Sequence, residues 1–545
     1  MPFPDFEPTI PELLRRAARA HGERTLVVLG ERRLAYATAE TRSANLACGI
    51  LDAGVGKGTH LALLMPNGPD WVVAFLAAAR IGAVVVPVNT FFRARELGWV
   101  LRHCDARVLL STRSFRGHDY AARMLEIAPD LARPAGDGSA SLRAAALPQL
   151  RAVFLDDPEG HGWAGSLEEL ERRGERLATA SGSSLRDAED DVTPADRAVV
   201  IYTSGSTAEP RGAIHTHGTI VRHAFNVNAC AGRGLGPEDR VWSPMPFFWV
   251  GGLVVSFLGA MHAGACLLCE EAFDAERTLD LLERERATLA AGWPHYGKAM
   301  ASHPSFPSRD LSSLRAGMVE ILPTARRPVD PTQRTNSLGM TETCGPHTFG
   351  REDDPPATLR GSFGRAIDGV EHKVSDPETG EALPPGAEGE ICVRGYSVMQ
   401  GFHKVERERT FDRDGFYRTG DGGRIDADGF LWFTGRLGDM IKTAGANVAP
   451  SEVEAILASF AEIKEAHVVG VPDPARGQNV AAAVVLAPGR SLDAKTLRER
   501  LRGELAAYKV PREVVFLEAG DLPFTDSGKI DKRRLRALLV ERLTA

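Results

Sequence analysis

The 545-residue sequence predicts an α/β fold, with a large N-terminal domain of doubly wound sheets and a β-rich subdomain, followed by a small α+β domain. The length exceeds what one hydrophobic core supports, since single cores stop growing at roughly 250 to 300 residues. Short β-branched runs alternate with helical patterns along the first part of the chain, and the pattern changes after residue 435. We therefore place the two domains at residues 1–435 and 436–545.

The first domain begins with alternating elements. From residue 9 to about 237, helical patterns alternate with apolar runs such as LVVL, HLALLM, AVVVPV and RAVVIYTS, which is typical of βαβ units on a parallel sheet. Residues 130–184 are loose and polar, so we expect a surface connection outside the core there. After residue 360, shorter runs such as GEICVRG and GFLWFTG, separated by Gly and Pro, predict the β-rich subdomain.

The second domain has a pattern of its own. It reads as the helix SEVEAILASF, the strands AHVVGVP and AAAVVLA, the helix LDAKTLRERLRGELAAY and a basic helix at the end. A compact tail of about a hundred residues can fold by itself. For the basic end, KIDKRRLRALLVERL, a solvated amphipathic helix is favoured over a nucleic-acid-binding arm.

Composition and charge exclude several classes of protein. Hydrophobic residues make up 43% and charged residues 25%, as in soluble globular proteins. With 65 basic and 72 acidic residues the net charge is −7, which leaves no electrostatic footprint for nucleic acid. The N-terminus lacks the pattern of a signal peptide, and we expect a cytoplasmic protein.

Two apolar segments have alternative interpretations. Residues 249–269 are uncharged and long enough for a membrane span, but Gly264 and the short run after it favour a buried helix that turns into a buried strand. Seven scattered cysteines suit a reducing compartment. Cys266 and Cys269 form a CxxC inside the run GACLLCEE, where a buried strand is favoured over a metal or redox site.

The most informative motif is YTSGSTAEPRG at residues 202–212, directly after the run RAVVI. Its small residues, hydroxyls and glycine would let backbone amides and Ser/Thr side chains close around a polyphosphate, and Arg211 adds positive charge. The spacing GxxxxGK[ST] of a Walker loop is absent. A solvent-exposed Ser/Thr loop is the alternative interpretation of this segment by itself.

This motif resembles the phosphate loop of the acyl-adenylate-forming superfamily, which includes acyl-CoA synthetases, luciferases and nonribosomal-peptide adenylation domains. Further motifs of that family follow in its order: SLGMTET at 337–343, GEICVRG at 389–395, YRTGD at 417–421, GRLGDMIKTAGANVAPSEVE at 435–454 and LPFTDSGKI at 522–530. The resemblance covers nearly the whole chain. It implies a large AMP-binding and acyl-binding domain and a small mobile domain that carries a catalytic lysine.

The resemblance implies roles for matching positions. Lys529, Glu342 and Thr203 would be catalytic, with Lys529 reaching the attacking carboxylate and the α-phosphate and Glu342 ligating Mg²⁺. Asp421 would accept both ribose hydroxyls, and Arg436 would be a second ribose or phosphate contact. Taken alone, each of these charged residues could instead form a surface salt bridge, and the lysine at position 529 could simply be solvated. The cofactor-binding set is Thr203, Ser204, Gly205, Ser206, Thr207, Arg211, Thr341, Asp421, Arg436, Lys442 and Gly445.

The family's second half-reaction uses a rotated small domain, which presents the segment GAN, beginning at Gly445, to the incoming thiol. By alignment the hinge falls on Gly438, where the family usually carries Asp or Lys. Hinges are a few residues that absorb large changes in φ and ψ, and glycine permits almost any such change. We therefore expect the small domain to turn about Gly438.

The segment PMPFFWVGG resembles a family segment in which a histidine stands where this chain has Trp249. Phe225, Phe248, Trp249 and Met340 would form an apolar acyl pocket, although Phe225 also suits an ordinary core cluster. Because no fixed counter-charge for a polar acyl tail is visible, the pocket favours a fatty, aromatic or alicyclic acid.

Several positions depart from the family pattern. Leu338 stands where a tyrosine usually stacks on adenine, Ala208 and Ala444 replace glycines, and Arg211 replaces a lysine. The stretch before SLGMTET lacks the amino-acid sequence that is usual in the family, so adenine contacts in residues 315–340 are not assigned. At Ala444 the added methyl group would narrow the backbone approach that glycine permits in the CoA tunnel.

The resemblance implies an AMP-forming acid–thiol ligase that uses ATP, Mg²⁺ and CoA. It would form acyl-AMP and pyrophosphate from ATP and a carboxylic acid, and then transfer the acyl group to CoA. A carrier-protein pantetheine, an amine or an oxygen nucleophile are alternative acceptors, and a catalytically silent acyl-adenylate-binding relative is the alternative outside the enzymes. The expected partners are small molecules, without nucleic acid or a transmembrane segment, and a homodimer stays open.

Overall fold

The computed structural model describes residues 3–132, 142–180, 184–203, 209–230, 234–292, 294–317, 337–351, 354–437, 441–448, 450–524 and 530–544. The chain divides into two compact units. The large unit consists of Met1–Thr90, Leu101–Tyr202 and Gly212–Gly435, and the small unit of Phe91–Val100, Thr203–Arg211 and Arg436–Ala545. Each unit is described by itself below.

The large unit contains an eight-stranded sheet with the order β22-β11-β10-β4-β3-β5-β8-β9. Strands β4, β3, β5, β8 and β9 pair in parallel, β10 pairs in parallel with β4, and β11 pairs antiparallel with β22. The alternation of apolar runs and helical patterns therefore predicted a parallel sheet correctly. The strands are β3 His60–Leu64, β4 Val84–Pro87, β5 Val108–Ser111, β8 Ala152–Leu155, β9 Gly165–Ser166, β10 Arg197–Thr203, β11 Arg211–Thr216 and β22 Gly401–Phe402.

A second, six-stranded sheet of the large unit has the order β15-β14-β12-β13-β1-β2 and is parallel except for the hairpin of β1 and β2. Helix α3 (Pro69–Arg80) is buried along nearly its whole length. It shares one hydrophobic cluster with Val27 of this sheet and Val85 of the other, so both sheets pack into a common core. The strands are β1 Thr25–Leu29, β2 Arg32–Ala35, β12 Arg240–Trp242, β13 Cys266–Cys269, β14 Leu289–Ala290 and β15 Ala316–Gly317.

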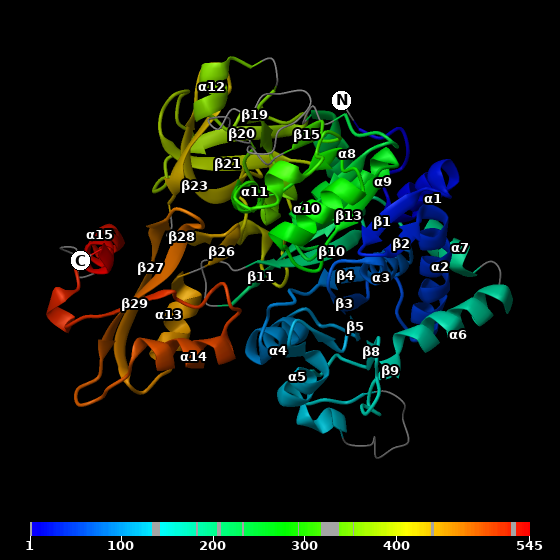
Figure 1. Ribbon diagram of the computed structural model, residues 1–545, viewed down its shortest axis with the longest axis horizontal. Helices are drawn as coiled ribbons and strands as arrows, with labels where there is room; N and C mark the ends of the chain where they lie inside the picture. The colour runs from blue at the N-terminus through cyan, green and yellow to red at the C-terminus, as the bar shows by residue number, and fades with distance from the viewer. Residues whose placement is uncertain are drawn as a thin grey trace. The chain divides into compact units, whose positions relative to one another are not determined.

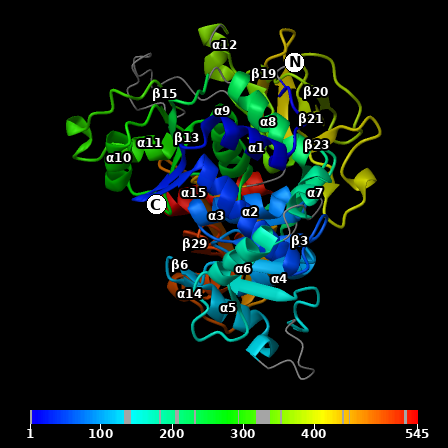
Figure 2. The same ribbon diagram turned by 90° about the vertical axis from the view of Figure 1, so that its right-hand side faces the viewer.

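The expectation that residues 130–184 form only a surface connection is wrong for the described part of that segment. Strand β8 belongs to the eight-stranded sheet, and helix α6 (Leu167–Ala180) runs alongside α2 (Tyr36–Asp52), as Figures 1 and 2 show. The two helices approach so closely that only glycine fits at two positions. A Cβ atom at Gly174 would lie 1.8 Å from the carbonyl oxygen of Asn45, and a Cβ atom at Gly49 would lie 2.3 Å from the carbonyl oxygen of Leu170. The runs PAGDGSAS and SGSS, which made the segment look loose in the sequence, lie outside the described residues except for Ser184.

The apolar segment 249–269 is a buried helix followed by a buried strand, as the sequence favoured. A π-helical stretch, η2 (Gly251–Leu258), leads into α9 (Gly259–Ala263), which ends at Gly264 in the left-handed conformation before β13. Among the described residues, no helix is long and apolar enough to cross a membrane. Cys266 and Cys269 are free and buried in β13, and the described residues contain no group of three or more side chains able to hold a metal ion.

The β-rich part of the large unit is a four-stranded sheet with the order β20-β21-β23-β24. Its strands are β20 Val370–Ser375, β21 Gly389–Gly395, β23 Tyr417–Ile425 and β24 Leu431–Arg436, at the runs that the sequence predicted. The other helices of four residues or more in the first 435 residues are α1 Ile10–His21, α4 Ala94–His103, α5 Tyr120–Ile127, η1 Pro129–Ala132, α7 Ser184–Asp190, α8 His217–Cys230, α10 Ala275–Arg284, α11 Pro294–Ala301 and α12 Pro356–Gly361.

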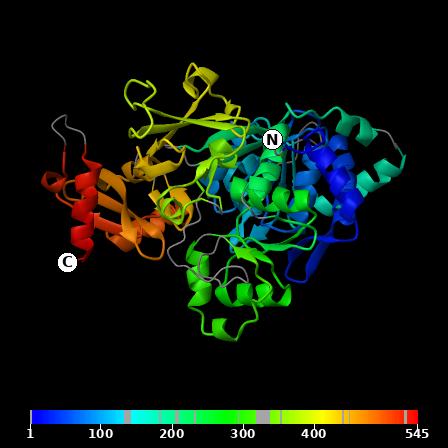
Figure 3. The same cartoon turned by 90° about the horizontal axis from the view of Figure 1, so that it is seen from above.

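The small unit contains a five-stranded sheet, with β26-β25-β28-β27 in order and β29 beside β28. Helix α15 packs on β27, and Figure 3 shows this red helix alongside the orange strands. Leu535 and Leu539 of α15 are buried, so the basic end is an amphipathic helix. The elements are β25 Ile441–Thr443, β26 Ala446–Val448, α13 Pro450–Ala458, β27 Ile463–Asp473, β28 Gly477–Leu486, α14 Ala494–Glu504, β29 Glu513–Phe516 and α15 Lys532–Thr544.

Candidate active site

The motif SLGMTET forms a tight hairpin in the large unit. Strands β16 (Gly339–Met340) and β17 (Gly345–Pro346) pair antiparallel around the 3₁₀ turn η4 (Thr341–Thr343). The Thr341 carbonyl accepts hydrogen bonds from the Cys344 amide (3.0 Å) and from Nε2 of His215 (2.8 Å). The Glu342 carbonyl accepts one from the Met399 amide at 2.8 Å. The backbone on both sides of the Glu342 side chain is therefore fixed.

Glu342 offers a half-buried carboxylate from this turn. Mg²⁺ prefers oxygen ligands and usually takes one or two carboxylates together with substrate phosphates and water. Since the described residues contain no cluster of three or more metal-binding side chains, an ion here would be held in that way. The chemistry of this single carboxylate fits Mg²⁺ brought with ATP.

Asp421 lies on β23 and is 2% exposed. Its amide donates to Oγ1 of Thr419 at 3.0 Å, and that hydroxyl donates to the Ile391 carbonyl at 2.7 Å, so the strand is held locally. A buried carboxylate is an acceptor for neutral hydroxyl donors such as a ribose diol. The backbone of Arg436 ends β24, whereas its side chain lies outside what the structure describes.

The phosphate-loop motif is described only at its two ends. Thr203 is the last residue of β10, and its hydroxyl is buried without a hydrogen-bond partner among the described residues. Arg211 begins β11, and Glu209 accepts a hydrogen bond from Arg95 at 2.9 Å. A buried hydroxyl without a partner suits a polar ligand. The predicted residues Ser204, Gly205, Ser206 and Thr207, and Ala208, lie outside the described residues.

Two predicted positions of the small unit lie in a hairpin between β25 and β26. Lys442 is on β25, and its amide donates to the Gln478 side chain at 2.9 Å. The two-residue turn consists of Ala444 (φ 48°) and Gly445 (φ 82°), both in the left-handed region that favours glycine. The catalytic candidate Lys529 and the hinge candidate Gly438 lie outside the described residues.

The four predicted acyl-pocket residues have different neighbours. Phe248 is buried and contacts Trp249 edge-on, with ring centroids 5.4 Å apart. Phe225, on α8, contacts His262, and the centroids of the two rings lie 5.5 Å apart. Met340 packs on a cluster that contains Ala213, Met399, Phe402, Phe411 and Tyr417. Phe248 and Trp249 contact each other, and a pocket formed by all four residues remains a prediction.

Leu338 is 5% exposed and belongs to a core cluster with Val227 and Val255. Its amide donates to Oγ1 of Thr348 at 2.8 Å, and its carbonyl accepts from the His347 amide at 2.8 Å. This leucine is thus part of the packing beneath the hairpin that carries Glu342.

Sequence reasoning missed His215 of β11. Its ring is fully buried, and burial lowers the pKa to about 4 against the opposing effect of the Thr341 carbonyl. The contact joins residues 126 positions apart, so no local spacing could have revealed it. A histidine in a strand beside the phosphate-loop motif was the only available signal.

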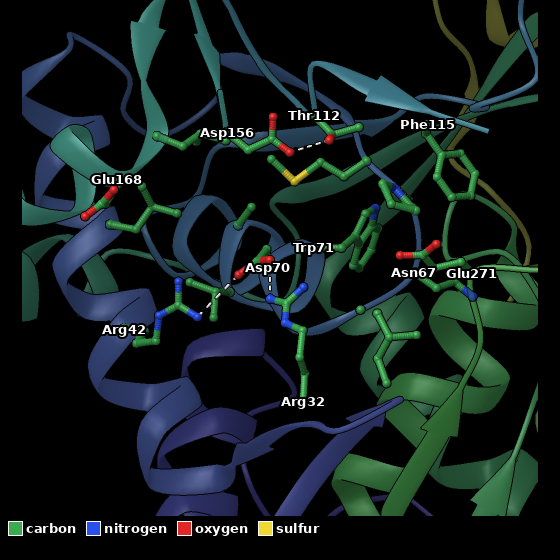
Figure 4. A pocket seen from close by; sticks show the side chains of 18 of the residues that line it. Arg32, Arg42, Asn67, Asp70, Trp71, Thr112, Phe115, Asp156, Glu168 and Glu271 are labelled. Atoms are coloured by element: carbon green, nitrogen blue, oxygen red, sulfur yellow. Dashed lines mark hydrogen bonds and ion pairs between the residues drawn. The ribbon is translucent and has the colours of Figure 1, made fainter. Parts of the chain in front are cut away.

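A cleft of about 530 Å³ lies elsewhere in the large unit (Figure 4). Asp70, at the start of α3, pairs with both Arg32 and Arg42 at its centre. None of the predicted site residues lines this cleft. It is therefore separate from the candidate active site.

Comparisons with known proteins agree with the motifs. The family model described as AMP-binding enzyme matches residues 14–403, and the model of the AMP-binding enzyme C-terminal domain matches residues 452–529. A putative acyl-CoA synthetase, YngI, of Bacillus subtilis (strain 168) is 32% identical over 549 residues, which cover 98% of this chain and 97% of that protein. The indoleacetate–CoA ligase of Aromatoleum aromaticum is 32% identical over 537 residues, covering 97% and 98%.

Among solved structures, the amide bond synthetase McbA from Marinactinospora thermotolerans superposes with a TM-score of 0.78 at 27% identity, covering 96% of this chain and 99% of that one. The fold, the order of the motifs and the full-length relatives lead to one conclusion. The chain belongs to the AMP-binding enzyme family and is an AMP-forming acid–CoA ligase that uses ATP, Mg²⁺ and CoA.

Proposed function

We propose that this ligase activates a fatty, aromatic or alicyclic carboxylic acid with the residues assigned above. The acid's carboxylate attacks the α-phosphorus of ATP, acyl-AMP forms and pyrophosphate leaves. The CoA thiol then attacks the acyl carbonyl, giving the thioester and AMP, and the thiol proton goes to solvent. Glu342 would hold the Mg²⁺ that neutralises charge on the leaving pyrophosphate, and Lys529 would stabilise the charge that develops at the α-phosphate.

The observation that carries the residue assignment is the hairpin around η4. Its backbone is tied by His215 and by the Met399 amide, so the Glu342 carboxylate starts from a fixed position. Preorganised groups stabilise developing charge better than groups that must first be ordered. This arrangement supports a metal-binding role for Glu342.

The acid class is inferred from the apolar pair Phe248–Trp249. A polarisable aromatic pair suits an apolar acyl group, which gains by leaving water. Of the two full-length relatives that are 32% identical, one has a name that specifies no acid, and the other is an indoleacetate–CoA ligase, whose acid is aromatic. An apolar acid, rather than a short charged one, is therefore our proposal.

The test is acid-dependent release of pyrophosphate with a panel of hexanoate, dodecanoate, benzoate, indoleacetate, cyclohexanecarboxylate and malonate, with and without CoA. We expect release with one or more of the five monocarboxylic acids, and turnover only when CoA is present. Release with malonate alone would contradict the proposed acid class. Turnover driven by a carrier protein or an amine, but not by CoA, would overturn CoA as the acceptor in this proposal.

Lys529→Ala tests the division between the two half-reactions. If the lysine serves only adenylation, acyl-AMP formation falls by at least about a hundredfold, the size seen when one preorganised charge-stabilising donor is removed. Thioester formation from supplied acyl-AMP and CoA stays near the wild-type rate. Equal loss in both half-reactions would remove Lys529 from this role.

An amine acceptor is the second candidate, because the amide bond synthetase McbA is 27% identical with a TM-score of 0.78. At Ala444, a methyl group stands where the family's pattern has glycine, in the turn next to the segment proposed to face the thiol. Competition between CoA and simple amines for pre-formed acyl-AMP separates the two acceptors. Faster amide than thioester formation would favour this second candidate.

A further inference from the structure

The backbone next to Glu342 has one side-chain anchor that belongs to another element. His215, on β11, donates from Nε2 to the Thr341 carbonyl at 2.8 Å. Among the described residues, the other hydrogen bonds of this turn come from the Cys344 and Met399 amides and from the turn's own Thr343, whose hydroxyl accepts from the Met340 amide at 3.2 Å and donates to the Gly345 carbonyl at 2.7 Å. His215 is the contact through which the strand that follows the phosphate-loop motif reaches the hairpin.

The chemistry of this contact defines the state of the imidazole. A carbonyl oxygen can only accept, so Nε2 must carry the proton. The ring is 0% exposed, and its Nδ1 has no hydrogen-bond partner among the described residues. A neutral ring with one proton, placed on Nε2, satisfies this geometry without burying a charge.

The position of the contact gives it a consequence for Glu342. In the chain Thr341 directly precedes Glu342, and the next carbonyl, that of Glu342 itself, is held by the Met399 amide. The chain then leaves the turn through Cys344 (φ 62°) and Gly345 (φ 121°). Both residues have positive φ, and together they sharply reverse the direction of the chain. Without the histidine, the Thr341 carbonyl would keep only the Cys344 amide as a hydrogen-bond donor among the described residues.

We propose that His215 is a positioning residue that orients the Glu342 carboxylate for Mg²⁺ through its hydrogen bond to the Thr341 carbonyl. The inference rests on the proposed role of Glu342. Partners that orient a metal ligand without touching the metal typically change metal affinity by about 10- to 100-fold when they are removed. His215 acts through the backbone, so its loss weakens Mg²⁺ binding and leaves the acid and CoA contacts intact.

The chain supplies a matched control two residues away. His217 is also 0% exposed, and its Nδ1 accepts a hydrogen bond from the Ile10 amide at 3.3 Å, on the N-terminal helix instead of the hairpin. His215→Leu and His217→Leu each remove one buried imidazole and one hydrogen bond to backbone. Only His215→Leu releases the turn that carries Glu342. His215→Gln keeps an amide donor that can reach the Thr341 carbonyl.

The experiment measures metal binding and activity. Mn²⁺ binding is titrated by electron paramagnetic resonance with the α,β-methylene analogue of ATP present, and the Mg²⁺ concentration for half-maximal pyrophosphate release is measured with a supporting acid. His215→Leu should raise both constants about tenfold or more, while His217→Leu stays within about threefold of wild type. His215→Gln should recover most of the loss. Thermal unfolding of all variants checks that they are folded.

Glu342→Gln, measured in parallel, separates the two levels of the argument. If Glu342→Gln weakens Mn²⁺ binding and His215→Leu does not, the metal role of Glu342 stands and the positioning role of His215 is overturned. If His215→Leu and His217→Leu weaken binding equally, the effect is general destabilisation and the inference is again overturned. If Glu342→Gln leaves Mn²⁺ binding unchanged, the proposed metal role falls, and the inference falls with it.

Discussion

The buried histidines of the large unit and a buried ion cluster of the small unit are two different kinds of buried polar group. The large unit buries neutral imidazoles, and burial is the main cause that lowers their pKa: to about 4 for His215 and His217, to about 3 for His223 and well below the usual range for His347. The small unit instead buries a charged cluster. Nζ of Lys509 lies 2.7 Å from a carboxylate oxygen of Glu96 and 2.7 Å from one of Glu452, with all three side chains at most 1% exposed.

The difference shows how each unit can fail. A buried neutral histidine is tolerated until protonation places a charge in the interior. A buried ion cluster is tolerated only while every member is present, since each charge compensates another. In the cluster, burial raises the pKa of Glu452 against the pull of Lys509, so this carboxylate depends on its lysine. The large unit should thus be sensitive to acid, and the small unit to the loss of one side chain.

Lowering the pH tests the large unit and has the largest expected effect. A histidine whose folded-state pKa is depressed stabilises the fold above its unfolded pKa near 6.5, and this contribution is lost as pH falls toward the folded value. For a folded pKa of 4 or lower, the loss between pH 7 and pH 5.5 is slightly more than about 1 kcal/mol per histidine, or about 5 kcal/mol for the four together. Urea unfolding followed by tryptophan fluorescence measures it, since six of the seven tryptophans belong to the large unit. A midpoint that stays constant from pH 7 to 5.5 would contradict this account.

Lys509→Met tests the small unit. It leaves Glu96 and Glu452 buried without their cation, so the small unit should lose about 3 to 5 kcal/mol. Hydrogen exchange of peptides from α13 and α14 measures the loss locally. Lys532→Met is the matched control: its ion pair with Glu454 is 3.3 Å long and partly exposed, so it should cost less than about 1 kcal/mol. Equal protection in the Lys509 variant and the wild type would show that the cluster does not hold the unit together.

Ala444→Gly sharpens the comparison at a solvent-side turn of the small unit. Ala444 has φ 48°, and the left-handed conformation costs an L-residue about 1 to 2 kcal/mol, part of which is offset by the greater freedom of glycine in the unfolded chain. A gain of about 1 kcal/mol in the small unit's free energy of unfolding is expected. The reverse change, Gly445→Ala at φ 82°, should lower it. A lower stability of Ala444→Gly would mean that its methyl group makes contacts that outweigh the strain.

The sequence predicted those parts of the fold that local patterns determine. Apolar runs such as HLALLM became strands buried on both faces, and alternation with helices indicated the parallel order. The segment with α6 was misjudged, because its helix is strongly polar on one side and its packing depends on Gly49 and Gly174 in different helices. Close approach between helices is a property of the pair and cannot be seen in either sequence alone.

The candidate site divides in the same way. The family resemblance predicted roles for Glu342, Asp421 and Thr203, and these roles stay predictions. The resemblance could not identify His215, whose role depends on a hydrogen bond to a backbone atom 126 positions away. Nor could it anticipate that the two residues of the turn at Ala444 and Gly445 both have positive φ, since an alanine gives no signal for that conformation.

The most direct test of the central claim, activation through acyl-AMP, follows oxygen from the acid. The enzyme is given ATP, Mg²⁺, CoA and an accepted acid labelled with ¹⁸O in both carboxylate positions, and the nucleotide product is analysed by mass spectrometry. Because the carboxylate oxygen attacks the α-phosphorus and the thiol later breaks the acyl–oxygen bond, AMP should carry one labelled oxygen atom and pyrophosphate none. Label in inorganic phosphate, with ADP as the nucleotide product, would contradict the account.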